Sequence, residues 1–239
     1  MYFCDLTLPS PAENLACDEA LLELAEDGQT GEILRIWEPG HYFVVLGYGN
    51  KAKTEVNLGY CRERGIPVYR RSSGGGTVLQ GPGAINFSLI LRIDETGSCH
   101  TISSANRFIM GRQQAAFSTL LGKSVDISGC TDLAIRGFKF SGNAQRRKKT
   151  HLLFHGSFLL NFDFALMERV LPLPSKQPGY RAGRSHSAFL TNLNVRPTDI
   201  KSLLKQTWSA LSPLPEVPSD AIAFLAQEKY GRDEWNLKF

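Results

Sequence analysis

The stretch Arg70–Leu79, RRSSGGGTVL, constrains this chain more than any other. Two arginines and two serines precede three consecutive glycines, and a β-type run follows. Glycine has no Cβ, so the backbone can bend sharply and lie close to a ligand. Successive N–H groups in such a bend form a concavity for anions, and the planar guanidinium of Arg71 suits carboxylate or phosphate. The alternative interpretation is a tight surface turn beside solvated arginines.

A second motif, KFSGNAQ, covers Lys139 to Gln145. Alternate residues of a strand share one face, so Ser141, Asn143 and Gln145 are expected on one side. There they would orient phosphate, ribose or adenine, or else form a polar face open to water. His155 follows on the apolar run LLFHGSFLL. A lone histidine on such a strand is more often a hydrogen-bonded core residue than a catalytic one.

Together these motifs closely resemble the catalytic domain of the lipoate–protein ligase family, whose wider group also holds lipoyl/octanoyl transferases and biotin–protein ligases. The resemblance runs from about Asn14 to about Asn192 and includes NLACDEALL, NFSL, HGSFLL and TNL. It implies an α+β fold in which a mostly antiparallel sheet is flanked by helices. Residues 1–239 are expected to form a single catalytic domain. The C-terminal accessory domain of many ligases is expected to be dispensable here or supplied by a separate polypeptide.

The resemblance also implies an activity, the ATP-dependent ligation of lipoate or octanoate to a lysine of a lipoyl-domain protein through an acyl-adenylate. Such acceptors are 2-oxoacid dehydrogenase subunits and the glycine cleavage H-type protein. Negative charge at the α-phosphate must be neutralised, usually with the help of Mg²⁺. Lys139 is the implied catalytic cation, and no residue is assigned to the metal. The implied binding residues are Arg71, Ser73, Gly74, Gly75, Gly76, Thr77, Val78, Leu79, Asn86, Ser141, Gly142 and Asn143.

The chain departs from the family pattern just after the glycines. Many relatives have His-Asp and then Gly-Asn, whereas this chain has Gln80-Gly81 and Gly83-Ala84. The usual asparagine is therefore missing, and Asn86 on the same expected strand is the candidate replacement. The departure leaves the acyl substrate and the adenylate contacts open.

Three other functions compete with the ligase. An ATP-independent lipoyl or octanoyl transferase would use a cysteine nucleophile. Cys130 is the candidate near KFSGNAQ, but it does not align with the transferases' cysteine, and an inert role is favoured. Biotin–protein ligases carry a different Gly/Arg signature. A binding module without chemistry is disfavoured because Arg71, the glycines and Lys139 are all retained.

Composition narrows the class of protein. Of 239 residues, 42% are hydrophobic and 21% are charged, an ordinary globular balance. The five cysteines are scattered without a CxxC pair, which disfavours a disulfide framework or zinc site. A net charge of +4 suits anionic ligands or an acidic partner protein better than nucleic acid. No apolar run reaches the ~20 residues of a membrane span, and the N-terminus has no signal-peptide pattern, so a cytoplasmic location is expected.

The chain is predicted to mix helices and strands. A capping box at Ser10 and Glu13 begins a helix that ends near Gly28. Strands 32–38 and 42–46 could pair as a hairpin, and Asp18 and Glu19 lie on a solvated face or against a neighbouring loop. Further strands are expected at 66–69, 85–93, 132–135, 138–144 and 152–160, and helices at 55–64, 102–121, 164–171, 199–211 and 220–230. Two basic clusters could contact pyrophosphate or an acidic partner, one at 146–149 and one at Arg181, Arg184 and His186.

Overall fold

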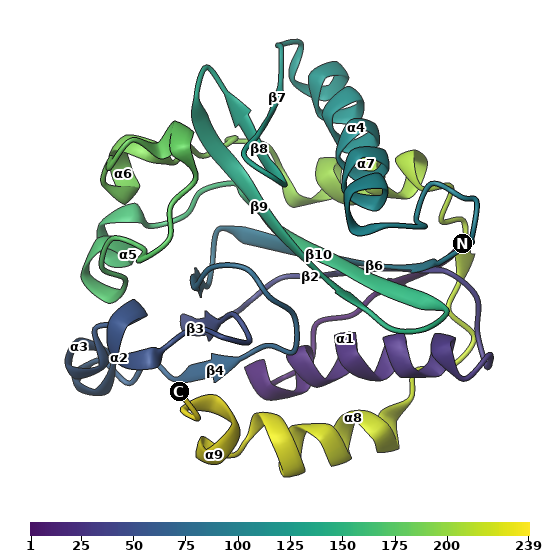
Figure 1. Ribbon diagram of the computed structural model, residues 1–239, viewed down its shortest axis with the longest axis horizontal. Helices are drawn as coiled ribbons and strands as arrows, with labels where there is room; N and C mark the ends of the chain where they lie inside the picture. The colour runs from purple at the N-terminus through teal and green to yellow at the C-terminus, as the bar shows by residue number, and fades with distance from the viewer.

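The computed structural model describes residues 1–239 and contains two sheets with helices around them (Figure 1). The larger sheet has eight strands in the order β11-β1-β2-β6-β10-β9-β8-β7. Its pairs are antiparallel from β2 to β7 and parallel where β1 joins β2 and β11. This mostly antiparallel sheet confirms the predicted α+β class. Its strands are β1 (Tyr2–Asp5), β2 (Ile33–Trp37), β6 (Ala84–Arg92), β7 (Asp126–Ser128), β8 (Asp132–Ile135), β9 (Phe138–Arg147), β10 (His151–Leu159) and β11 (Ser212–Pro213).

The smaller sheet has the order β4-β3-β5 and carries the glycine-rich loop between β4 (Val68–Arg70) and β5 (Val78–Gln80). The predicted hairpin of strands 32–38 and 42–46 is wrong, because β2 and β3 (Phe43–Leu46) belong to different sheets. Both strands are buried along their whole length and pair with distant strands on each edge. The Pro39-Gly40 turn signal therefore marks a crossing between sheets.

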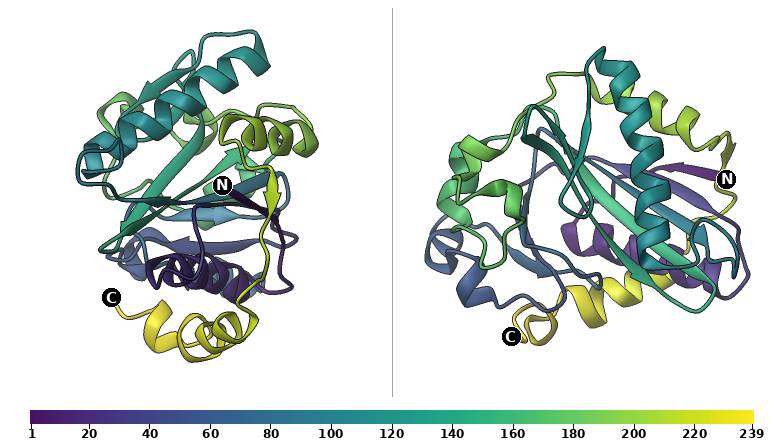
Figure 2. Two further views of the ribbon diagram at one scale, coloured as in Figure 1. Left: turned by 90° about the vertical axis from the view of Figure 1, so that its right-hand side faces the viewer. Right: turned by 45° about the horizontal axis from the view of Figure 1, so that its top comes forward.

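Helices cover both faces of the large sheet (Figure 2). On one face lies α1 (Pro11–Glu26), which begins with the predicted capping box, and α8 (Ser219–Leu225) packs beside it. On the other face lie α4 (Ile102–Leu121) and α7 (Pro197–Thr207). The sheet therefore separates two cores, one with α4 and α7 and one with α1.

The remaining helical segments are short. They are α2 (Ala52–Glu55), α3 (Leu58–Glu63), α5 (Phe164–Val170), α6 (His186–Phe189), α9 (Asp233–Asn236), a 3₁₀ turn at Gly179–Arg181 and a π-helical turn at Ala226–Tyr230. The predicted helix 55–64 is interrupted because the Asn57 side chain accepts a hydrogen bond from the Tyr60 N–H and begins α3. Strand β9 continues to Arg147, beyond its predicted end. None of the helices combines the length and hydropathy that a membrane crossing requires.

A buried ion pair joins α1 to the large sheet. The Arg35 guanidinium on β2 is fully buried, and its Nη1 lies 2.7 Å from Asp18 Oδ1. Burial raises the pKa of Asp18, but the Arg35 charge and hydrogen bonds outweigh it, so this pKa is lowered. Glu19 is also buried and accepts from Lys229 and Tyr230. Of the two alternatives, a solvated face is wrong because both side chains are buried, and their partners come from β2 and the C-terminal helical turn rather than from a neighbouring loop.

We predict that Asp18→Ala lowers the free energy of unfolding by about 3–5 kcal/mol, because it leaves the Arg35 guanidinium buried without its counter-ion. Urea denaturation at neutral pH measures this change. Asp27→Ala, which removes an exposed carboxylate at the end of the same helix, should change it by less than about 0.5 kcal/mol. Equal effects of the two substitutions would contradict the assigned role.

The same pair predicts a pH dependence. The folded-state pKa of Asp18 lies below its unfolded value near 4, so the ion pair contributes stability above that pH. The stability difference between wild type and Asp18→Asn should be full at neutral pH and should shrink as the pH falls through the folded pKa. A difference that stays constant down to pH 2 would contradict the pairing.

Candidate functional site

A cavity of about 480 Å³ lies between the two sheets. Strands of both sheets line it, together with the glycine-rich loop and the segment from Pro174 to Leu190. Of the residues singled out in the sequence, the structure brings together Arg71, Gly75, Gly76, Thr77, Val78, Leu79, Asn86, Lys139, Gly142 and Asn143. Ser73, Gly74 and Ser141 do not line the cavity.

The three glycines form an open backbone at the edge of this cavity. Gly74, Gly75 and Gly76 are exposed, and their amide N–H groups donate to no acceptor in the protein. Gly75 has φ +87°, and a Cβ on it would lie 2.8 Å from Arg71 Nη2 and 3.3 Å from Ala144 Cβ. The loop can therefore offer backbone donors to an anion, as the sequence predicts.

Arg71 lies beneath this loop and is nearly buried, with 7% of its surface exposed. Its Nη2 donates to the carbonyls of Gly74 at 2.6 Å and Gly76 at 2.8 Å, and its Nε donates to Ser73 Oγ at 3.0 Å. Burial lowers the pKa of Arg71 to about 10, so the side chain stays charged at neutral pH. The sequence suggested a free fork for an anion, whereas the guanidinium here holds the loop's own carbonyls.

A Ser–His–Asp contact supports the loop from the other side. Ser73 Oγ lies 2.6 Å from His155 Nε2, and His155 Nδ1 lies 3.7 Å from Asp18 Oδ2. Ser73 is only 1% exposed and does not line the cavity, so its hydroxyl is closed to a substrate. These groups therefore hold the loop rather than supply a nucleophile.

The C-terminal segment holds the loop as well. Arg70 is fully buried without a carboxylate, and its Nη1 donates to the carbonyls of Gly47, Tyr48 and Asn50. Trp235 Nε1 donates to the Arg70 carbonyl at 2.7 Å. The Tyr48 N–H in turn donates to the Ser73 carbonyl at 2.9 Å. Helix α9 thus stabilises the base of the glycine-rich loop.

Lys139 projects from β9 into the cavity. Its Nζ lies 2.8 Å from Asp132 Oδ1, and the Tyr180 hydroxyl donates to Asp132 Oδ2 at 2.7 Å. A β-bulge in β9 places Lys139 and Gly142 on one face, and a Cβ at Gly142 would lie 2.6 Å from Lys139 Nζ. Gly142 therefore leaves room for the ammonium group, and Asp132 and Tyr180, which the sequence analysis missed, orient it.

The other polar residues of β9 share one side, as predicted, but their amides point toward neighbouring protein groups. Asn143 Nδ2 donates to the Thr131 carbonyl at 2.6 Å, and Gln145 Nε2 donates to Asn106 Oδ1 on α4 at 2.6 Å. Ser141 is 1% exposed and lies within 3.4 Å of Asn143 Nδ2. Ligand contacts by Ser141 and Asn143 remain a prediction.

The two basic clusters differ in their surroundings. Arg146 and Lys148 pair with Glu19 and Glu23 of α1, so this hairpin end is only partly a free cationic surface. In the second cluster, Arg181 and His186 are buried and line the cavity. Arg184 does not line it, and its guanidinium donates to the carbonyls of Gly137 and Tyr180. The irregular segment that carries this cluster closes the cavity beside Lys139.

The cavity contains few groups suited to a nucleophile or a metal. Cys130 is exposed and lines it, whereas burial raises the pKa of the other four thiols. No group of three His, Cys, Asp or Glu side chains is placed to hold a metal ion. The two cavity carboxylates, Asp18 and Asp132, are each ion-paired. Any metal ion used here would therefore be held mainly by the ligand, with Asp132 as the carboxylate beside Lys139.

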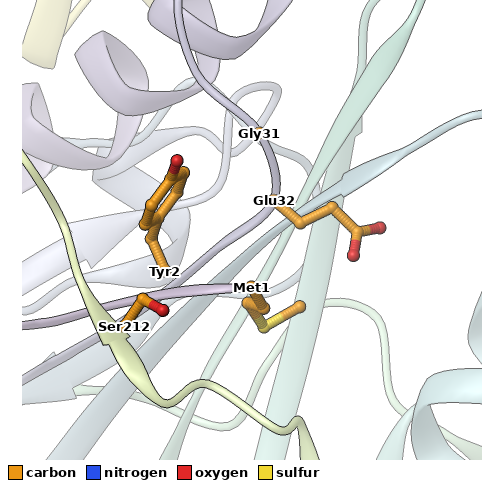
Figure 3. A pocket seen from close by; sticks show the side chains of 5 residues that line it. All are labelled: Met1, Tyr2, Gly31, Glu32 and Ser212. Carbon is orange, nitrogen blue, oxygen red and sulfur yellow. The ribbon is translucent and has the colours of Figure 1, made fainter.

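A second hollow, of about 320 Å³, lies where β1 meets β11 (Figure 3). Met1, Tyr2, Gly31, Glu32 and Ser212 line it, and Glu32 is its only charged side chain. It contains neither a cationic side chain nor a candidate nucleophile near a base. We therefore assign the chemistry to the larger cavity.

A lysine beside free glycine amides, in a cavity between two sheets, is suited to binding a negatively charged group such as a carboxylate or phosphate. Residues 10–209 match the family described as lipoyl protein ligase A/B catalytic domain, and the chain belongs to that family. It is thus an enzyme of the lipoate ligase and octanoyltransferase family. Most of the chain takes part in the match, including every residue of the candidate site.

Curated relatives include both activities. The octanoyltransferase LipM of Brevibacillus brevis is 28% identical over 96% of this chain and 95% of its own length. Lipoate–protein ligase 1 of Staphylococcus aureus is 27% identical over 96% of this chain and 70% of its own length. Sequence similarity alone therefore does not choose between a ligase and a transferase.

Solved structures share the fold. A putative lipoate protein ligase from Thermoplasma acidophilum with bound lipoic acid has a TM-score of 0.82 at 22% identity and covers 100% of this chain and 99% of that chain. A lipoate-protein ligase A bound with ATP has a TM-score of 0.79 at 24% identity, with 99% and 98% of the two chains covered. These matches confirm the predicted sheet flanked by helices.

We predict that Gly75→Ala, but not Gly74→Ala, disrupts the loop. Alanine at Gly75 would take a left-handed backbone and meet the Arg71 guanidinium, at a cost of about 1–2 kcal/mol from the backbone alone. A Cβ on Gly74 would meet nothing within 4 Å. Thermal denaturation and calorimetric titration with octanoate should show lower stability and weaker binding for Gly75→Ala only. Normal binding by Gly75→Ala would mean that the loop is only a turn.

Proposed function

We propose that this enzyme joins lipoate or octanoate to a lysine of a lipoyl-domain protein in an ATP-dependent reaction through an acyl-adenylate. The observation that carries the proposal is the pair of unpaired amides at Gly75 and Gly76, which line the same cavity as Lys139. Transfer of an acyl group from a carrier thioester to a lysine amine involves no phosphoryl chemistry, whereas adenylation must bind phosphate. A cradle of backbone donors suits adenylation.

Lys139, the glycine-rich loop and Asp132 have separate roles in the two half-reactions of the proposed ligation. In the first half-reaction a carboxylate oxygen of the fatty acid attacks the α-phosphorus of ATP, and pyrophosphate leaves. Lys139 neutralises charge at the reacting oxygens, and the glycine amides hold phosphate. In the second half-reaction the acceptor amine attacks the acyl carbon, and AMP leaves. Asp132 holds the ammonium group of Lys139 in place, and Mg²⁺ would supply further charge neutralisation on the phosphates.

The second candidate is an ATP-independent transferase. It is favoured by Cys130, which is exposed and lines the cavity, and by the similarity to LipM octanoyltransferases. In that reaction the Cys130 thiolate would take the acyl group from a carrier thioester and release the carrier thiol. The acceptor lysine amine would then attack the acyl-cysteine and restore the thiolate.

The proposed acceptors are lipoyl-domain proteins, namely subunits of 2-oxoacid dehydrogenases and the glycine cleavage H-type protein. A bi-partite lipoate protein ligase from Thermoplasma acidophilum, studied with its E2 lipoyl domain, has the same fold as this chain at a TM-score of 0.81. The acceptor lysine must reach the acyl carbon beside Lys139. The exposed side of the cavity near Cys130 offers that approach.

Pyrophosphate release tests the ligase against the transferase. Purified protein given ATP with lipoate or octanoate should release pyrophosphate, and Cys130→Ser should keep most of this activity, because adenylation needs no thiol. The transferase would release none and would form a thioester on Cys130. Detection of that thioester by mass spectrometry, together with an inactive Cys130→Ser variant, would replace our proposal with the second candidate.

Lys139→Ala should reduce acyl transfer to the acceptor by about 10²–10³-fold, the usual cost of removing one electrostatic group at a reacting centre. Lys123→Ala is the matched control, because that lysine is exposed just after α4 and outside the cavity, and it should leave the rate unchanged. Circular dichroism confirms that both variants are folded. Near wild-type activity in Lys139→Ala would remove Lys139 from the chemistry.

A further inference from the structure

Three neutral polar side chains gather in the cavity next to the Lys139 site. Gln80 comes from β5, Asn86 from β6 and Ser157 from β10, and all three line the cavity. Gln80 Nε2 donates to Ser157 Oγ at 2.8 Å, and the Ser157 hydroxyl donates to Asn86 Oδ1. Gln80 and Asn86 are only 7% and 3% exposed. The cluster is therefore a buried hydrogen-bond network that joins the two sheets.

The two amides are incompletely bonded. Gln80 Oε1 and Asn86 Nδ2 are buried and have no hydrogen-bond partner. Buried polar side chains without partners are uncommon, and an unmet donor or acceptor is costly. Within the protein, these two atoms are therefore ready for a ligand that supplies the missing bonds.

The single hydroxyl proton of Ser157 determines which hydrogen-bonding groups the ligand must carry. The Ser157 hydroxyl has one proton, so it donates to one amide and accepts from the other. If both amides were turned over, Gln80 would expose its nitrogen and Asn86 its oxygen. In either arrangement the unpaired atoms are one acceptor and one donor. The complementary ligand group therefore carries one donor and one acceptor close together.

The register of the strands places this cluster beside the reacting centre. Ser157 pairs with Gly142, whose missing Cβ leaves space for Lys139 Nζ, and Asn86 pairs with Ser157 from the other side. Adjacent strands lie about 4.8 Å apart, so the cluster begins one strand away from Gly142. A substrate whose carboxyl or thioester carbon reaches Lys139 would have its neighbouring groups near these amides.

We propose that Gln80, Asn86 and Ser157 form a recognition site for a neutral group with one N–H donor and one adjacent acceptor. Two parts of the substrates have this chemistry: the edge of adenine, and an amide such as those of a pantetheine thioester. The location beside the acyl centre rests on the proposed function of Lys139. The hydrogen-bond complementarity does not, and binding measurements test it separately from any activity.

The experiment compares two matched ligand pairs by calorimetric titration of the full chain. One pair is the octanoyl thioester of N-acetylcysteamine, which has an amide, and S-ethyl octanethioate, which has none. The other pair is AMP and purine riboside monophosphate, which lacks the N6 amino group. Wild type should prefer the ligand with the complete donor–acceptor group in one pair by about tenfold. The pair in which the preference occurs identifies the source.

Variants then assign the preference to the cluster. Gln80→Met and Asn86→Leu keep the side-chain size and remove the hydrogen bonds, and each should reduce the preference to near one. Gln145→Met is the matched control, because Gln145 lies outside the cavity and bonds to α4, and it should keep the preference. No preference by wild type in either pair, or an unchanged preference in both cluster variants, would overturn the site. If a variant fails to fold, the wild-type titrations still show whether the protein prefers the ligand with the complete donor–acceptor group.

Discussion

The buried guanidinium of Arg71 is the interaction on which the site depends. A charged group in this position is tolerated because the carbonyls of Gly74 and Gly76 and the Ser73 hydroxyl accept its hydrogen bonds. By binding the loop's carbonyl groups, Arg71 leaves the amide N–H groups of the same loop without partners. The positive φ of Gly75 and the absence of its Cβ make this inward bend possible. The loop is thus held in shape before any ligand arrives, which reduces the ordering cost of binding.

Segments far apart in the sequence provide the support for this loop. Asp18 from α1 reaches it through His155 and Ser73, and α9 near the C-terminus reaches it through Arg70. The Tyr180–Asp132–Lys139 contacts hold the cavity where β8 and β9 line it. The contacts beneath the loop pair the buried side chains of Asp18, Ser73 and Arg70, which would be costly without partners, so polar bonding as well as apolar packing determines the shape of the cavity.

Local sequence signals predicted local structure well. The capping box at Ser10, the helix at Ile102–Leu121 and the tight turn between β8 and β9 all occur in the structure. The predicted pairing of β2 with β3 is wrong because the partners of a strand depend on tertiary burial rather than on a Pro-Gly turn. The partners of Asp18 lie in distant elements, and Tyr180 lies in an irregular segment, so no periodicity indicated them. Asp132 could have been inferred, since the tight turn pairs its strand with β9 and brings it near Lys139. Gln80 departs from the family pattern, but its hydrogen bond to Ser157 joins two different sheets and so could not be predicted from local sequence.

The central claim is that an acyl carboxyl is bound at Lys139 beside the glycine-rich loop. A crystal structure of the protein with octanoate tests this claim most directly. We expect a carboxylate oxygen within hydrogen-bonding distance of Lys139 Nζ and the alkyl chain inside the cavity between the two sheets. Octanoate bound elsewhere, with the cavity empty and Lys139 contacting only Asp132, would contradict the account.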